Sequence, residues 1–156
     1  MTEIEILQFF LPKVLIATIC GAIIGIEREL KNKVAGLRTN ILICVGSAVF
    51  AASAFYFAKM YGADIADPTR MLSTIITGVG FLGGGVIMKN NEDKITGITT
   101  ASFIWVMSGI GILAGFGAVL APIILTIGLL IVSFVFAKIE GFIKKQKQKH
   151  IHNQEE

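Results

Sequence analysis

The residues best able to do chemistry are charged and hydroxyl side chains at or near the ends of long apolar runs. They are Glu27, Arg28, Glu29, Arg38, Thr39, Asp67, Arg70, Thr77, Thr99 and Thr100. Carboxylate and hydroxyl oxygens can bind a cation, and paired carboxylates and guanidinium groups can hold two helices together. Apolar runs of this length are typical of membrane-spanning helices, and charged residues in or near such helices are costly and often functional. These positions are therefore the first candidates for a site.

The group around residues 27–29 and 38–40 stands where one apolar run ends and the next begins. Glu27 with Lys31, and Glu29 with Lys33, have the i, i+4 spacing that supports a helix end. Arg38 is also close enough in the chain to pair with Glu27 across the short loop, which would link two helices.

A second charged pair, Asp67 and Arg70, precedes the third apolar run. Asp67 followed by Pro68 predicts a helix N-cap with proline at the first helical position. Arg70 is near enough to bridge to Asp67. Two interpretations stay open, plain helix capping or a site for an ion or a partner.

Small residues recur at the four-residue spacing that lets membrane helices approach closely. The helix-packing candidates are Gly21, Gly25, Gly78, Gly80, Gly84, Gly111 and Gly115. In the third run, Thr74, Thr77 and Gly84 share one narrow, mildly polar face with Arg70. That face suits the bundle centre or a partner helix, and a path lined by water or ions is the alternative.

Several function classes have little support. No His, Cys or carboxylate group clusters at catalytic spacing, so we expect no enzyme, no metal site and no cofactor. Cys20 and Cys44 lie inside apolar runs and are expected to be buried as small hydrophobic residues. Nucleic-acid binding would need a basic folded surface. Most of the net charge of +3 instead belongs to the C-terminal stretch.

Composition indicates an integral membrane protein. Of the 156 residues, 54% are hydrophobic and 16% are charged, against about 45–50% and about 25% in soluble domains. Charges divide the chain into the runs 6–26, 39–58, 71–88 and 95–137. The last run has 43 uncharged residues, about 64 Å as one helix and twice the hydrocarbon thickness. It must fold back, and Gly115-Phe116-Gly117 is the predicted turn, so we predict an all-α bundle of about five transmembrane helices.

The basic residues between the runs predict the orientation. Eleven lysines and arginines fall on one predicted side and two, Lys59 and Arg70, on the other. The positive-inside rule then places the N-terminus outside and the C-terminus in the cytoplasm, and an odd number of spans agrees with this. We expect residues 1–138 to form the transmembrane domain and residues 139–156 a basic cytoplasmic tail.

A shift of 61 residues aligns two short segments, KVAGLRT at 33–39 and KITGITT at 94–100. Both precede a helix that leaves the same predicted side. This match suggests a parallel repeat, in which the first helix pair is related to the second by an axis along the membrane normal. Chance remains the competing explanation.

Five motifs together resemble the N-terminal membrane domain of the MgtC/SapB family. They are GIERE at 25–29, AGLRT at 35–39, DPTR at 67–70, TGVGFLGGG at 77–85 and GITTA at 97–101, followed by Trp105. The resemblance covers roughly residues 15–115. It implies a bacterial inner-membrane protein of about five helices, associated with magnesium limitation, acid or envelope stress, and survival of pathogens in host cells. The resemblance does not extend to the C-terminal cytoplasmic domain of longer members, so we expect a short form.

The resemblance favours a non-enzymatic modulator of other membrane machinery over a magnesium carrier. Its expected partners are the lipid bilayer, other membrane proteins and a second copy of the chain. The alternative is a small Mg²⁺ or proton transporter with a path from Asp67 to Glu27 along Thr74 and Thr77. A continuous polar channel between these carboxylates would favour transport, and a dry, glycine-packed centre would favour regulation.

Overall fold

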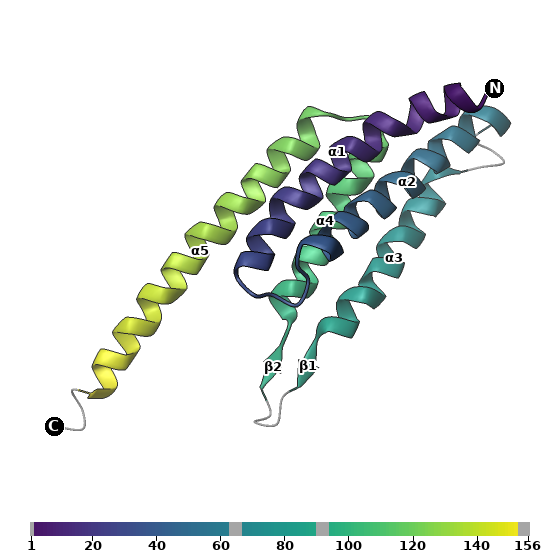
Figure 1. The fold of residues 1–156 in the computed structure, drawn as a ribbon. Coiled ribbons are helices and arrows are strands. Elements are labelled where there is room, and N and C mark those ends of the chain that lie inside the picture. Colours follow the sequence, from purple (N-terminus) through teal and green to yellow (C-terminus); the bar gives the residue numbers. More distant parts are fainter. Residues whose placement is uncertain (1, 63–66, 90–93, 153–156) are drawn as a thin grey trace. The chain divides into compact units, whose positions relative to one another are not determined.

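The chain folds into five helices and one short β-hairpin, described by a computed structural model for residues 2–62, 67–89 and 94–152 (Figure 1). In chain order they are α1 (Glu3–Leu30), α2 (Leu37–Tyr61), α3 (Pro68–Val86), β1 (Met88–Lys89), β2 (Ile95–Thr96), α4 (Ile98–Gly115) and α5 (Leu120–His152). Residues 1–126 form one compact unit, and residues 127–156 form a second. In its described part, the second unit is the continuation of α5.

Local sequence signals account for several helix ends. Thr2 and Glu5 form a reciprocal capping box at the start of α1. Asp67 caps α3 with Pro68 in the first turn, as predicted. The predicted turn after α4 is also confirmed, because α4 ends at Gly115 and Gly117 has a positive φ of 89°, which glycine adopts without steric cost.

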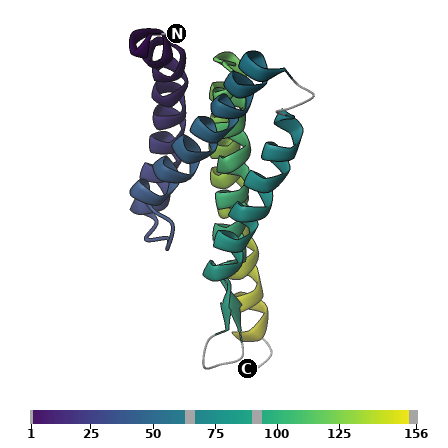
Figure 2. The same ribbon diagram turned by 90° about the vertical axis from the view of Figure 1, so that its right-hand side faces the viewer.

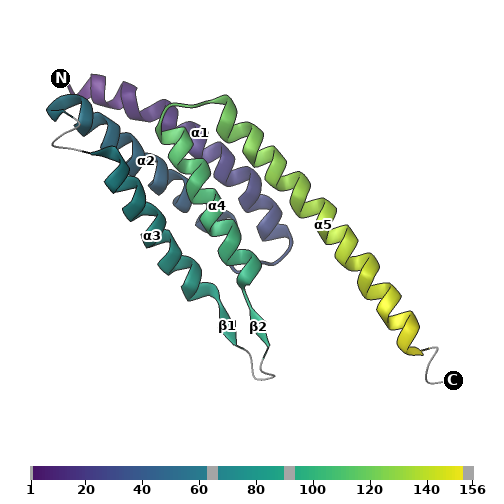
Figure 3. The same cartoon turned by 180° about the vertical axis from the view of Figure 1, so that it is seen from behind.

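The first four helices run alternately in opposite directions (Figures 1 and 3). The helices α2 and α4 contact each other at the centre, and α1 and α3 each contact both of them. Figure 2 shows the β-hairpin extending beyond α3, at the end of this unit opposite the N-terminus. The hairpin pairs Met88 with Thr96 and Lys89 with Ile95. The predicted loop after the third span therefore contains a short hairpin that the sequence did not indicate.

Four helical segments are long and apolar enough to cross a membrane, namely α1, α2, α4 and Leu120–Ile143 of α5. The 19-residue α3 is not among them, since Arg70 and its threonines and glycines lower its hydropathy. However, α2 and α4 run in the same direction, so the chain between them must return through the same thickness. A 19-residue helix is about 28 Å long, close to the hydrocarbon thickness of about 30 Å. The chain is thus an all-α membrane helical bundle, and the fifth crossing follows from topology.

The helix contacts support the predicted repeat. If α1–α2 and α3–α4 are related by a two-fold axis, the α1–α4 contact must have a counterpart between α3 and α2, and both occur. A residue and its counterpart in the other helix pair can contact each other only if both lie at this two-fold axis. Ser47 and Ser108 are 61 residues apart and their hydroxyl oxygens are 2.9 Å from each other.

The centre of the first unit is built from small and apolar side chains. Ala17, Cys20, Cys44 and Ala48 are fully buried there. The prediction of buried cysteines is confirmed, and both are free thiols. Towards the C-terminus, α5 continues through the basic stretch to His152, since lysine and glutamine are good helix formers. The basic tail predicted from residue 139 is therefore helical as far as the structure describes it.

Candidate functional site

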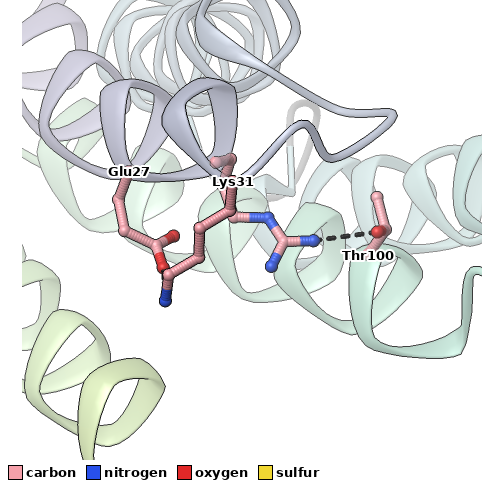
Figure 4. A network of polar contacts seen from close by, with 4 residues as sticks. Glu27, Lys31 and Thr100 are labelled. Atoms are coloured by element: carbon pink, nitrogen blue, oxygen red, sulfur yellow. Dashed lines mark hydrogen bonds and ion pairs between the residues drawn. The ribbon is translucent and has the colours of Figure 1, made fainter. Parts of the chain in front are cut away.

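A buried arginine links α1 to α4 (Figure 4). Arg28 is 2% exposed, and its Nη2 donates a 2.8 Å hydrogen bond to Oγ1 of Thr100. Its guanidinium lies over the ring of Phe103, 4.3 Å from the centroid, a favourable cation–π geometry. The last turn of α1 is thereby joined to the first turns of α4, 72 positions away in the chain.

Two carboxylates of the same cluster hold the end of α1 and the start of α2. Glu27 forms an ion pair with Lys31 one turn later, which confirms the predicted i, i+4 pairing. Glu29 instead accepts a 2.8 Å hydrogen bond from the backbone N–H of Leu37. Gly36, the N-cap of α2, has no side chain to satisfy this group, and Glu29 takes that role.

Asn40 organises the loop between α1 and α2. It is fully buried, and its Nδ2 donates to the carbonyl oxygens of Ala35 at 2.9 Å and Gly36 at 2.8 Å. Within the described part of the chain, Asn40 Oδ1 and Arg28 Nε are buried without a hydrogen-bond partner. A polar amide in an otherwise apolar run was the available signal for Asn40, which the candidate set omitted.

The remaining candidates at this end lie on the surface. Arg38, Thr39 and Thr99 are exposed on the first turns of α2 and α4. The structure therefore divides the predicted polar cluster. Arg28 and Thr100 are in contact and buried, while Arg38 and Thr39 face outward at the start of α2.

The pair Asp67 and Arg70 lies at the other end of the bundle. Asp67 Oδ1 accepts hydrogen bonds from the Thr69 amide and from the Thr69 hydroxyl, both at 2.8 Å. These two bonds, with a smaller electrostatic contribution from Arg70, lower the pKa of Asp67 below its ordinary value. The geometry is that of helix capping.

We expect the cap to weaken at acidic pH. Because the folded-state pKa of Asp67 is lowered, its contribution to stability is present above the ordinary aspartate pKa and is lost as the pH falls through the folded value. Hydrogen–deuterium exchange at the Thr69 amide should therefore accelerate on acidification, beyond the intrinsic pH dependence of exchange. Asp67→Asn should still cap the helix, but its Thr69 amide should show only the intrinsic pH dependence of exchange. The same additional acceleration in Asp67→Asn and in the unaltered chain would contradict capping by the Asp67 carboxylate.

The polar face of α3 lies outside the centre of the first unit. Thr74 Oγ1 donates to the carbonyl oxygen of Arg70 at 3.0 Å, and Thr77 Oγ1 donates to that of Ser73 at 2.9 Å. Both hydroxyls are exposed, and Phe81 on this helix is 85% exposed. The expectation that this face occupies the bundle centre is therefore not met within residues 2–126. A partner helix remains a prediction.

The candidate glycines separate into two groups. A Cβ added to Gly21 would lie 2.7 Å from Ile41 Cα, and one added to Gly25 would lie 2.8 Å from Leu37 Cα. Gly111 and Gly115 likewise lie against the carbonyl oxygens of Cys44 and Ala48. All four permit close approach to the backbone of α2. In contrast, Gly78, Gly80 and Gly84 on α3 have open space above them.

Two grooves border α3. The larger, of about 710 Å³, lies between α2 and α3 and is lined mainly by apolar side chains. The smaller, of about 440 Å³, lies between α3 and α4 and includes Gly80, Gly84 and Trp105. Among the described residues, no three His, Cys, Asp or Glu side chains come together as a metal site.

Three further residues, Phe103, Ser47 and Ser108, were missed. Phe103 carries the cation–π contact of Arg28, and Ser108 bonds Ser47 across the middle of the bundle. The signal for the serine pair was available, because the two are separated by the 61 residues of the proposed repeat. No local pattern pointed to Phe103.

Comparisons with known proteins agree on one family. The family model of the MgtC family matches residues 14–142. The chain is 45% identical over 111 residues to Protein SapB of Bacillus subtilis, covering 69% of this chain and 47% of that protein. It is 44% identical over 113 residues to YhiD of Escherichia coli K12, whose name proposes magnesium transport, covering 70% and 52%. It is 39% identical over 116 residues to Protein MgtC of Salmonella typhimurium LT2, covering 74% and 47%.

The chain spans about half the length of these curated relatives. No solved structure matches it.

Proposed function

Because the chain belongs to the MgtC family, we propose that it is a multi-pass protein of the bacterial plasma membrane that modulates other membrane machinery without catalysing a reaction. The setting we propose is adaptation to low magnesium or to acid or envelope stress. The means is contact within the membrane, between the glycine face of α3 and a transmembrane helix of another protein or of a second copy. The activity of the longer relatives enters only as part of this proposal.

One observation carries the proposal, the different environments of three Gly-xxx-Gly motifs. Those at 21–25 and 111–115 are packed against the backbone of α2, whereas the motif at 80–84 has open space above it. Inside a bilayer, small residues promote association by permitting close helix packing, since lipid tails are as apolar as leucine. A third motif of the same kind, exposed beside the α3–α4 groove, is suited to receive a helix from outside this unit.

The centre of the first unit gives further support. Close packing of Gly111 and Gly115 against α2 fills the space between α2 and α4. Ser47 and Ser108 satisfy each other there. The carboxylates of Glu27 and Asp67 are engaged by Lys31 and Thr69 at opposite ends of the bundle. This glycine-packed centre favours modulation over conduction.

Blocking the exposed motif tests the proposal. A Cβ added at Gly84 has no neighbour within 4 Å, and the residue borders an open groove, so we expect Gly84→Leu to fold normally. Loss of close approach should weaken helix association by about 1–3 kcal/mol. The readout is rescue of growth at low magnesium in a strain lacking its own family member, at matched membrane levels.

Gly109→Leu is the matched control, because Gly109 is also helical, exposed and without neighbours within 4 Å. We expect Gly84→Leu to lose rescue and Gly109→Leu to keep it. Full rescue by Gly84→Leu would refute the role of this face.

A magnesium or proton transporter is the second candidate, favoured by the name of the relative YhiD. Purified protein in liposomes separates the two. We expect no flux of Mg²⁺ or protons above that of empty liposomes. Flux that disappears in Asp67→Ala would establish transport instead.

A further inference from the structure

The exposed face of α3 has the period of a coiled-coil interface. Arg70, Thr77 and Gly84 are seven residues apart, and Thr74 and Phe81 fall between them at the same interval. Alternating steps of four and three residues place side chains on one stripe, the pattern by which a helix pairs with another of its kind. All five residues are exposed, and Phe81 is 85% exposed. We call this stripe the α3 seam.

The opposite face of α3 packs inside its own unit and fixes the direction of the seam. Ile75 contacts the buried cluster that includes Val79, and Gly83 is also buried. These positions lie about half a helical turn from the seam, so the seam points away from the first unit. Because α3 also falls short of the apolarity of the other spans, a protein surface suits this face better than lipid tails do.

The N-terminal end of the seam carries one charge of each sign. Asp67 is the N-cap, Arg70 follows in the first turn, and both are exposed. Within the part of the chain that the structure describes, Arg70 forms no ion pair with Asp67. Long side chains on a helix lean towards its N-terminus, so Arg70 can reach the level of residue 67 on a parallel neighbour. The two charges therefore match a second α3 that runs in the same direction.

The other half of the seam combines one protruding ring with several glycines. Phe81 has Gly78, Gly80, Gly84 and Gly85 around it, and no described atom lies within 4 Å of a Cβ added at these four positions. An aromatic ring of one helix can therefore lie against the glycines of another at the same depth. A two-fold interface uses the same patch on both copies, and this face supplies both halves of each contact.

We propose that two copies of the chain pair in parallel through the α3 seam. Arg70 of each copy forms an ion pair with Asp67 of the other, and the ring of Phe81 packs over the glycines of the neighbouring helix. Thr77 lies at the centre of the interface. Its hydroxyl donates to the carbonyl oxygen of Ser73 in its own helix and can still accept a hydrogen bond. This inference names the partner of the exposed α3 face, and so it rests on the proposed function.

Cysteine crosslinking of the purified chain in liposomes tests the position of the seam. A disulfide requires Cβ atoms about 3.8 Å apart, which the proposed interface provides at position 77. With copper phenanthroline as oxidant, we expect Thr77→Cys to form a covalent dimer. Leu82→Cys is the matched control, because Leu82 is exposed on the same helix but lines the groove towards α2. It should not crosslink, nor should the unaltered chain, whose Cys20 and Cys44 are fully buried.

A charge exchange tests direct pairing between copies. Arg70→Glu gives a copy with two negative charges at this end, and Asp67→Arg gives a copy with two positive charges. Each variant alone should dimerise about tenfold more weakly, because two symmetry-related ion pairs are replaced by like charges. An equal mixture should regain the affinity of the unaltered chain. Energy transfer between labelled copies in liposomes, measured at increasing lipid dilution, gives the affinities, and circular dichroism verifies folding.

The outcomes separate this inference from the proposed function. It is overturned if Thr77→Cys crosslinks no better than Leu82→Cys, or if the mixture pairs no better than either variant alone. A monomeric chain whose rescue of growth is lost in Gly84→Leu would also overturn it, and would leave the proposed function with another protein as partner. If Gly84→Leu instead abolishes the dimer and keeps rescue, the pairing stands and the proposed function fails.

Discussion

Replacing Gly111 with alanine is expected to lower the free energy of unfolding by about 1–3 kcal/mol, the usual cost of overpacking a close-packed interior. A Cβ at this position would overlap the carbonyl oxygen of Cys44 on α2. The conflict is with backbone, which cannot rotate away as a side chain can. Relief therefore requires α4 to move away from α2 along the central contact of the bundle.

Gly109→Ala is the control for this prediction. Gly109 is two positions away on the same helix, but it is exposed and nothing lies within 4 Å of its added Cβ. Alanine is the better helix former by about 1 kcal/mol, so this variant should be unchanged or slightly more stable. Denaturant unfolding in detergent micelles measures both. Equal stability of the two variants would show that α2 and α4 are not in close contact.

The second large effect concerns the buried arginine. Thr100→Val removes the hydroxyl that accepts from Arg28 while preserving side-chain volume. A buried donor left without its acceptor costs about 1–3 kcal/mol, and more when the donor is charged. We therefore expect Thr100→Val to lower the free energy of unfolding by at least this amount.

A double-mutant cycle tests whether the cost arises from this contact. In an Arg28→Met background the guanidinium is absent, so Thr100→Val should be nearly neutral. The two substitutions should couple by about 1.5–3 kcal/mol, the range for hydrogen bonds to charged groups. Thr99→Val provides the control, since Thr99 is the exposed neighbour. Additive effects of the two substitutions would contradict a direct Arg28–Thr100 interaction.

Much of the fold was predictable because it depends on short stretches of chain. The 43-residue uncharged run exceeds twice the length that a membrane accommodates, so the turn near Gly117 was required by distance alone. The cap at Asp67 and the ion pair of Glu27 with Lys31 involve residues within four positions of each other. Local spacing is sufficient for contacts of this kind. The orientation from the basic loops stays a prediction.

The site was predicted less completely, as Arg38 illustrates. Its spacing from Glu27 suggested an ion pair, whereas the structure places Arg38 on the surface at the start of α2 and pairs Glu27 with Lys31. The hairpin after α3 was missed because each of its strands has only two residues. Strands this short contain no periodic pattern to recognise.

The sequence by itself determined that this is a membrane bundle, where its chain must turn and which small residues are available for close packing. Only the tertiary structure decided which glycines are used. The motifs at 21–25 and 111–115 pack against α2, and the equally good motif at 80–84 faces outward. It also decided that Arg28 meets Thr100 rather than Arg38 meeting Glu27. The physical reason is that a helical pattern specifies which residues share a face, while the rotation of each helix in the bundle selects the neighbour that this face contacts.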